Sequence, residues 1–167
     1  MSNQMPRKRS DRLDRSILEC LQTDGRLSNQ ELAERVALSP SPCLRRVRAL
    51  ERSGVIRQYV ALLDPAKIGL AMLAYVSVKL EKKGRMPVEQ FTRSVQGWSE
   101  VVACYSMTGD MDYLIRVQVE DLDHFSRFIM EKLLKQPGVI DIRSNFVLER
   151  IKDTTAVPLA HLVRADR

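Results

Sequence analysis

The chain has 167 residues, a length that allows one large domain or two small ones. Hydrophobic residues make up 44% and charged residues 29%, which excludes a disordered chain of low hydrophobicity. The longest apolar stretch, residues 70–78, is too short to cross a bilayer, which takes about 20 residues. The first ten residues lack a secretory signal, so we expect a soluble protein of the cytoplasm with no membrane partner.

Positive charge is concentrated in the first third of the chain. Residues 1–60 contain 12 Lys and Arg against 7 Asp and Glu, whereas residues 61–167 contain 15 against 14. Part of the excess belongs to residues 1–9, which we expect to form a basic flexible tail, and most of the rest lies between Arg45 and Arg57. A localised basic cluster is typical of a surface that binds phosphate groups.

Three short helices are predicted after this tail. The first covers residues 13–21, with Asp11 as its N-cap. The second begins at Ser28, where Glu31 three residues later completes a capping box.

The third helix has clear start and stop signals. Ser39 is its predicted N-cap, Pro40 takes the first helical position and Gly54 ends it as a left-handed cap. Three short helices with a brief turn between the second and the third describe a helix-turn-helix.

The third helix has two chemically different faces. At about 100° per residue, one face is polar and basic and the opposite face is apolar. The polar face consists of Ser41, Arg45, Arg48 and Arg52, and the apolar face of Cys43, Val47 and Leu50. The arginine side chains are suited to entering a major groove, where arginine binds guanine or clamps phosphate. An amphipathic helix with a solvated arginine face is the alternative interpretation.

The position of each side chain along this helix suggests its role. We expect Ser41 and Arg45, near the start, to contact bases, and we expect Arg46, Arg52 and Arg57 to contact phosphates. The predicted DNA-binding residues are Ser39, Ser41, Pro42, Arg45, Arg46, Arg48, Arg52 and Arg57.

The segment after the third helix is predicted to be a strand. Residues 55–63 are rich in β-branched and aromatic side chains, which favours a wing or a connecting strand, and Asp64 and Pro65 then break the chain. The expected organisation is a winged helix-turn-helix at residues 10–64, a linker at 65–69, a second domain at 70–152 and a C-terminal tail at 153–167.

The second domain is predicted to have the order β-α-β-β-α-β, which is the ferredoxin-like arrangement. Strands are expected at residues 73–80, 101–107, 113–119 and 139–148, and helices at residues 87–96 and from Asp121 to about Pro137. The strand at residues 113–119 shows clean alternation of apolar and polar residues. The chain is therefore expected to belong to the α+β class.

Several motifs resemble a known family. Residues 13–65, and above all the stretch SPSPCLRRVRALERSGVI, closely resemble the leucine-responsive regulator/asparagine regulator (Lrp/AsnC) family of bacterial and archaeal transcription factors. The resemblance continues through GDMDYL at residues 109–114 and LLKQPGV at residues 133–139, and it is nearest to the leucine-responsive branch. It implies a C-terminal domain of the RAM type, which regulates amino-acid metabolism and pairs sheets into dimers that often assemble into octamers.

The GDMD turn offers the chemistry that a free amino acid requires. An ammonium group needs an acceptor and a carboxylate needs N–H donors. Gly109 lets the backbone approach closely, and Asp110 and Asp112 supply carboxylates, although an ordinary polar hairpin turn is the alternative.

The resemblance places the effector pocket around this loop, between subunits. It implies effector contacts by Gly109, Asp110, Asp112, Tyr113, Leu134 and Phe146. The family often has valine at the position of Phe146, which leaves the size of the pocket open. Leucine, another branched-chain amino acid or methionine is the expected effector.

Catalytic motifs are lacking in the sequence. His124 and His161 lack metal-ligand spacing and are expected at the surface, and Trp98 is expected to pack. We therefore expect no enzyme, no metal and no cofactor apart from the amino-acid effector. The preferred interpretation is a sequence-specific regulator that binds double-stranded DNA; an architectural DNA-wrapping protein, or an enzyme that uses the winged helix for protein contact, is the alternative.

Overall fold

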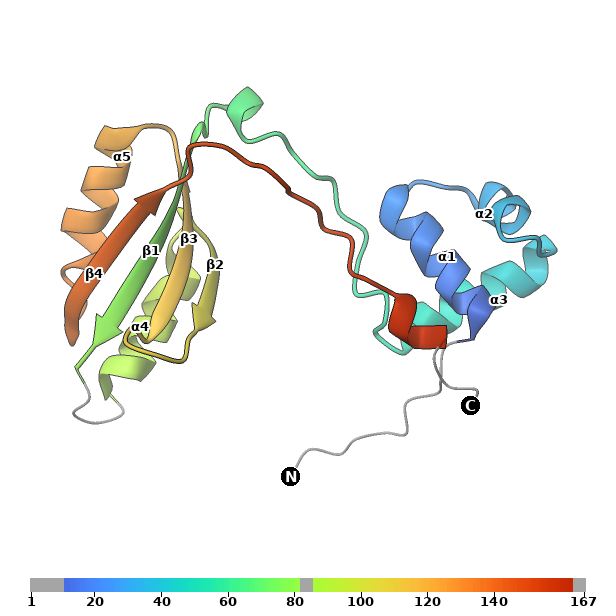
Figure 1. Cartoon of the computed structure of the whole chain (residues 1–167), viewed down its shortest axis with the longest axis horizontal. Helices are drawn as coiled ribbons and strands as arrows, with labels where there is room; N and C mark the ends of the chain where they lie inside the picture. Colours follow the sequence, from blue (N-terminus) through green and yellow to red (C-terminus); the bar gives the residue numbers. More distant parts are fainter. Residues whose placement is uncertain (1–10, 82–85, 164–167) are drawn as a thin grey trace. The chain divides into compact units, whose positions relative to one another are not determined.

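The computed structural model describes residues 11–81 and 86–163, so the basic tail predicted for residues 1–9 lies outside the described residues. The chain divides into two compact units (Figure 1). One consists of the residues up to Leu62 together with those from Lys152 onward, and the other is Leu63–Ile151. The division lies close to the predicted linker.

The first unit is a three-helix domain. Its helices are α1 (Arg12–Thr23), α2 (Asn29–Arg35) and α3 (Pro40–Arg52). Asp11 caps α1, because its carboxylate accepts hydrogen bonds from the N–H groups of Leu13 and Asp14 at 3.0 and 2.9 Å. The capping box of Ser28 and Glu31 is present at the start of α2. Both predicted caps are thus confirmed.

Left-handed residues end α2 and α3. Gly54 follows α3 with a φ of 72°, as predicted. Ala37 follows α2 with a φ of 53°, which is a conformation that a β-carbon disfavours. The N–H of Leu38 donates to the carbonyl of Ala33 at 2.9 Å and closes this turn. Ser39 takes the N-cap position of α3, but its side chain makes no capping hydrogen bond.

A buried apolar cluster, which we call the helical core, holds the three helices together. It consists of Ile17, Leu18, Leu32, Ala33, Val36, Cys43, Val47 and Leu50. All three residues of the predicted apolar face of α3 belong to it. The helix therefore turns the side chains of Arg45, Arg48 and Arg52 outward.

The predicted strand at residues 55–63 is wrong for the described chain. These residues belong to no strand, and the four strands of the described sheet lie in the second unit. The side chains of Val60, Leu62 and Leu63 are 63, 70 and 67% exposed. A strand-forming composition needs a neighbouring strand to pair with, and no described segment provides one here.

The second unit has the predicted ferredoxin-like order. Its elements are η1 (Ala66–Ile68), β1 (Met72–Leu80), α4 (Met86–Gly97), β2 (Val101–Ser106), β3 (Tyr113–Val119), α5 (Leu122–Arg127), η2 (Phe128–Leu133) and β4 (Val139–Phe146). The strands form one antiparallel sheet in the order β2-β3-β1-β4 (Figure 1).

The helices pack on one face of this sheet. Phe91 and Val95 of α4 and Phe125 of α5 share one core with the inward side chains of β1 and β3. The second predicted helix continues from α5 into a π-helical turn, η2, where the N–H of Leu134 donates to the carbonyl of Ile129 at 2.9 Å. The sequence had predicted a regular α-helix for these residues.

Two predictions for single side chains had different outcomes. Trp98 packs edge-on against Phe91 and Phe128, which confirms its packing role. His124 is half-buried, at 25% exposed, and lies 3.7 Å from Glu100, so it reaches the predicted surface only in part. Among the residues that the structure covers, no helix is long and apolar enough to span a membrane.

Candidate DNA-binding and effector sites

Four of the predicted DNA contacts lie together on α3. Ser41, Arg45, Arg48 and Arg52, which we call the arginine face, line one open hollow of about 240 Å³ together with Leu44. All four are exposed. Within residues 11–81 and 86–163, none of the three arginines forms an ion pair with a carboxylate. Their positive charge is therefore available to an anionic partner.

Leu44 was not predicted as part of this surface. It lies at about 300° from Ser41 on the helical wheel, at the border between the polar and apolar faces. Its half-buried side chain nevertheless lines the hollow beside the arginines. An apolar side chain on a recognition helix can contact the methyl group of thymine.

Arg46 points to a different side of α3. Its Nη1 donates to Asp11 Oδ2 at 2.7 Å and to Asp14 Oδ1 at 2.8 Å. These bonds raise the pKa of the Arg46 guanidinium. The pKa of Asp11 is lowered, mainly by the hydrogen bond from the N–H of Asp14 and to a smaller extent by Arg46. The placement argues against the predicted phosphate contact, because the guanidinium already joins α3 to the start of α1.

The remaining predicted DNA contacts lie outside the hollow. Ser39 is exposed just before α3, and Pro42 is half-buried in its first turn. Arg57 is exposed in the extended segment that follows α3. These residues surround the arginine face along the chain but do not line its hollow.

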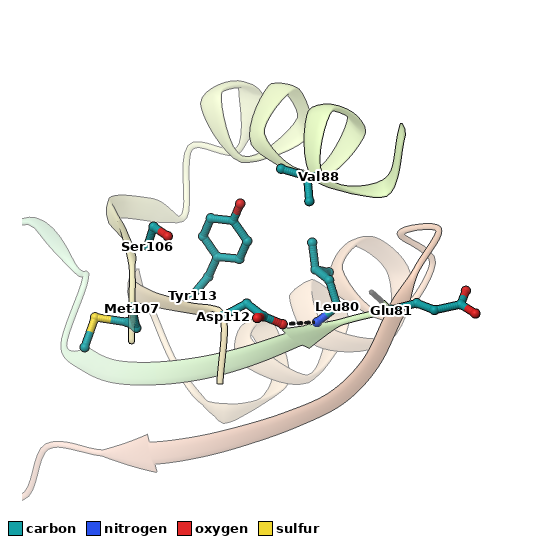
Figure 2. Close-up of a pocket in the computed structure, with 7 residues that line it drawn as sticks. All are labelled: Leu80, Glu81, Val88, Ser106, Met107, Asp112 and Tyr113. Atoms are coloured by element: carbon teal, nitrogen blue, oxygen red, sulfur yellow. Dashed lines mark hydrogen bonds between the residues drawn. The ribbon is translucent and has the colours of Figure 1, made fainter. Parts of the chain in front are cut away.

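Two of the six predicted effector residues line a pocket at one end of the sheet. The pocket has a volume of about 260 Å³. Its lining residues are Leu80, Glu81, Val88, Ser106, Met107, Asp112 and Tyr113. Figure 2 shows the side chains of Leu80, Val88 and Tyr113 pointing toward one another, while Glu81 and Met107 extend outward.

Asp112 connects the strands that border this pocket. Its Oδ2 accepts a hydrogen bond from the N–H of Leu80 at 2.8 Å (Figure 2). Its own N–H donates to the carbonyl of Val78 at 3.0 Å, and its carbonyl accepts from the N–H of Met107 at 2.8 Å. For the part of the chain that is described, the second carboxylate oxygen, Oδ1, has no hydrogen-bond partner.

Tyr113 forms the aromatic wall of the pocket. Its ring packs against Phe91 with the ring centres 4.8 Å apart. Burial raises the pKa of the Tyr113 hydroxyl, with smaller contributions from Cys104 and Asp112. The hydroxyl is therefore protonated at neutral pH and can donate a hydrogen bond.

The structure does not bring the other four predicted effector residues into the pocket. Gly109 and Asp110 are exposed at the tip of the β2–β3 turn, and Gly109 has the φ of 109° that favours glycine. Leu134 is 46% exposed after η2. Phe146 pairs with Ala74 across β1 and β4, about 13 Å along β1 from the partner of Tyr113.

Sequence reasoning missed five of the lining residues. Leu80 and Ser106 are the last residues of β1 and β2, and Tyr113 is the first residue of β3. Antiparallel pairing brings these three positions to the same end of the sheet. The predicted strand order could therefore have located Leu80 and Ser106. Val88 comes from the first turn of α4, whose approach to this end of the sheet had no local sequence signal.

A helix-turn-helix with an exposed arginine face, joined to a ferredoxin-like domain with a pocket, defines a DNA-binding regulator with a ligand-binding domain. Family models agree with both parts. The model described as winged helix-turn-helix DNA-binding matches residues 10–57, and the model described as Lrp/AsnC ligand binding domain matches residues 73–157.

Individual proteins show the same relationship. The leucine-responsive regulatory protein of Escherichia coli (strain K12) is 44% identical over 153 residues, which cover 92% of this chain and 93% of that protein. A transcriptional regulator of Neisseria meningitidis, solved as a complex with L-Met, superposes with a TM-score of 0.90 at 47% identity, over 92% of this chain and 99% of that one.

A third relative extends the comparison. An AsnC family transcriptional regulator from Agrobacterium tumefaciens has a TM-score of 0.87 at 40% identity, over 92% of this chain and 100% of that one. The chain belongs to the Lrp/AsnC family of transcription regulators. The resemblance of its motifs and the expected fold class are confirmed.

Proposed function

We propose that this regulator binds double-stranded DNA through the arginine face and that an amino acid bound near Asp112 and Tyr113 changes its DNA affinity or its assembly. The observation that carries the proposal is the arginine face itself. Three unpaired arginines of the described chain project from one helix whose opposite side is fixed in the helical core. Such a helix can enter the major groove as a rigid unit.

The arginine face divides into two kinds of contact. Ser41 and Arg45 lie nearest the start of α3, where recognition helices meet base edges. Arg48 and Arg52 lie further along the helix, and we assign them to phosphates. Leu44 lies between these groups and supplies an apolar contact.

The pocket and the neighbouring β2–β3 turn offer groups for each part of an amino acid. We assign the ammonium group to Asp112 Oδ1, because Oδ2 already accepts from Leu80. Gly109 and Asp110 do not line the pocket, but the N–H groups of their exposed turn are the donors that we assign to the carboxylate. Leu80 and Val88 offer apolar contact to a side chain.

This lining favours an apolar effector. Leucine, another branched-chain amino acid or methionine fits the chemistry of Leu80 and Val88. Methionine gains support from the solved complex of the Neisseria regulator with L-Met, and leucine from the name of the Escherichia coli relative. These two amino acids are therefore the first to test.

We further propose that the regulator works as a dimer, which can assemble into larger forms. Helices cover one face of the sheet, whereas Tyr75, Arg116 and Asn145 are cross-strand neighbours on the other face. Light scattering with and without amino acids tests the assembly.

The DNA part of the proposal is tested with Arg45→Ala in the full chain. Fluorescence anisotropy on a duplex obtained by in vitro selection should show weaker binding. Arg93→Ala on α4 is the matched control, since it removes one positive charge that is also exposed but lies outside the arginine face. Equal affinity of Arg45→Ala and the wild type would contradict the proposal.

The effector part is tested by a thermal shift screen with each amino acid at about 5 mM. An amino acid present at about 100 times its dissociation constant should stabilise the protein by about 2.7 kcal/mol. A selective shift identifies the effector. The absence of any shift, with DNA binding intact, would favour an architectural DNA-wrapping protein with little effector response.

A further inference from the structure

The C-terminal segment is packed on α1 of the first unit. Residues 154–163, which we call the strap, end in the 3-10 turn η3 (Ala160–Val163) beside α1 (Figure 1). The side-chain amide of Gln22 forms two hydrogen bonds with the backbone of Val157, one as acceptor and one as donor. The N–H of Val157 donates to Gln22 Oε1 at 2.6 Å, and Gln22 Nε2 donates to the carbonyl of Val157 at 3.2 Å.

Apolar side chains complete this docking. Leu159 and Leu162 are half-buried and pack against the helical core. Val157 lies between α1 and solvent with its side chain 61% exposed. The strap thus uses backbone polar groups and two leucines, which is a specific docking mode and not a loose apolar contact.

The helical core is small, so the two leucines of the strap that cover it are important for its stability. It contains eight buried residues from three short helices. A domain of about 60 residues buries a modest share of its surface and is only marginally stable. Ile17 and Leu18 of α1 and Cys43 and Val47 of α3 belong to the same core, so the strap supports the packing that orients the arginine face.

The strap also makes the first unit depend on both ends of the chain. It follows β4, whose pairing with β1 extends to the N–H of Val147, which donates to the carbonyl of Leu73 at 2.9 Å. The polypeptide therefore leaves the helix-turn-helix after Leu62 and returns to it at Lys152. The two units are joined by two segments of chain.

We propose that the surface of α1 is a docking site for the strap, and that the helix-turn-helix binds DNA with full affinity only while the strap is docked. This inference rests on the proposed function of the arginine face. Undocking uncovers one side of the helical core and increases the population in which α3 is displaced. If the competent fraction falls to about one tenth, the apparent Kd rises about tenfold.

The test uses the full chain with Leu159→Ser and Leu162→Ser combined. Both substitutions are uncharged, so they leave the electrostatic attraction to DNA unchanged. The matched control is Val157→Ser, which changes an exposed side chain of the same strap and keeps the backbone bonds to Gln22. Anisotropy measures affinity on the selected duplex, and hydrogen exchange measures protection of α1 and α3.

The double variant should show about a tenfold higher Kd, faster exchange in α1 and α3, and an unchanged salt slope, while Val157→Ser matches the wild type. If the double variant fails to fold, Gln22→Leu removes both hydrogen bonds and should give a smaller loss in the same direction. Faster exchange of the strap with wild-type DNA affinity would overturn the proposal. A wild-type affinity of Arg45→Ala would instead refute the role of the arginine face.

Discussion

Replacing Arg46 with alanine separates the two roles that an arginine of α3 can have. Arg46 bridges Asp11 and Asp14 at 2.7 and 2.8 Å, whereas Arg48 faces the open hollow. Arg46→Ala should therefore reduce stability and leave the number of phosphate contacts unchanged. Arg48→Ala should leave stability unchanged and reduce the number of phosphate contacts.

The expected loss of stability follows from the geometry. Hydrogen bonds to charged groups contribute about 1.5–3 kcal/mol each when shielded, and solvent exposure reduces this value. Because the side chains of Arg46 and Asp11 are 28 and 52% exposed, we expect Arg46→Ala to cost about 1–2 kcal/mol in total. For a small domain, each kcal/mol lowers Tm by about 4–8 °C.

The salt dependence of DNA binding supplies the second measurement. Arg48 and Arg52 of each subunit of a dimer neutralise about four phosphates, which gives a log–log slope of about −4. Arg48→Ala removes two of these contacts and should make the slope shallower by about 2. Arg46→Ala should keep the wild-type slope, measured by anisotropy between about 50 and 200 mM salt.

Two outcomes would refute this reasoning. A shallower salt slope for Arg46→Ala would mean that its guanidinium leaves Asp11 and Asp14 to bind phosphate, as the sequence alone suggested. An unchanged Tm would mean that the bridge contributes nothing to the packing of α3 on α1. Arg46→Lys, which keeps the charge but not the planar fork, should restore part of the stability.

Three further predictions concern other positions. Ala37→Gly should raise the free energy of unfolding by about 0.5 kcal/mol in urea titrations, because glycine adopts the φ of 53° without strain; a loss would contradict it. Lys132→Met should cost about 1–3 kcal/mol, because it removes the ammonium 2.6 Å from Glu100, which is 8% exposed. Burial raises the pKa of Glu100, but the hydrogen bond and charge of Lys132 outweigh it and the pKa lies below the ordinary 4.5. This stabilisation is therefore present above pH 4.5 and lost as the pH falls further, so denaturation followed against pH should show a smaller acid loss in Lys132→Met. Asp112→Asn keeps an acceptor for Leu80 but removes the charge, and calorimetry should show about tenfold weaker amino-acid binding with unchanged DNA affinity.

Local sequence patterns predicted much of the fold. Asp11, Ser28 and Gly54 were readable as helix ends because capping depends on residues a few positions apart. The arginine face followed from the helical period alone. The alternation in residues 113–119 likewise identified the strand that became β3.

Features that depend on distant partners were not predictable in this way. The composition of residues 55–63 favours a strand, but strand formation needs a partner that the described chain does not supply. Arg46 bonds to a carboxylate 35 positions earlier, and Gln22 bonds to Val157 at a separation of 135. In the effector pocket, Val88 belongs to α4, and no local sequence pattern shows that the start of this helix lies beside the ends of β1 and β2.

In this regulator an amino acid is expected to control DNA binding. The most direct test is the DNA affinity of the full chain, measured by anisotropy on the selected duplex with and without saturating L-methionine or L-leucine. We expect one of them to change Kd by about fivefold or more, and Asp112→Asn to reduce the response at the same ligand concentration. A Kd that neither these nor any other amino acid changes would contradict it.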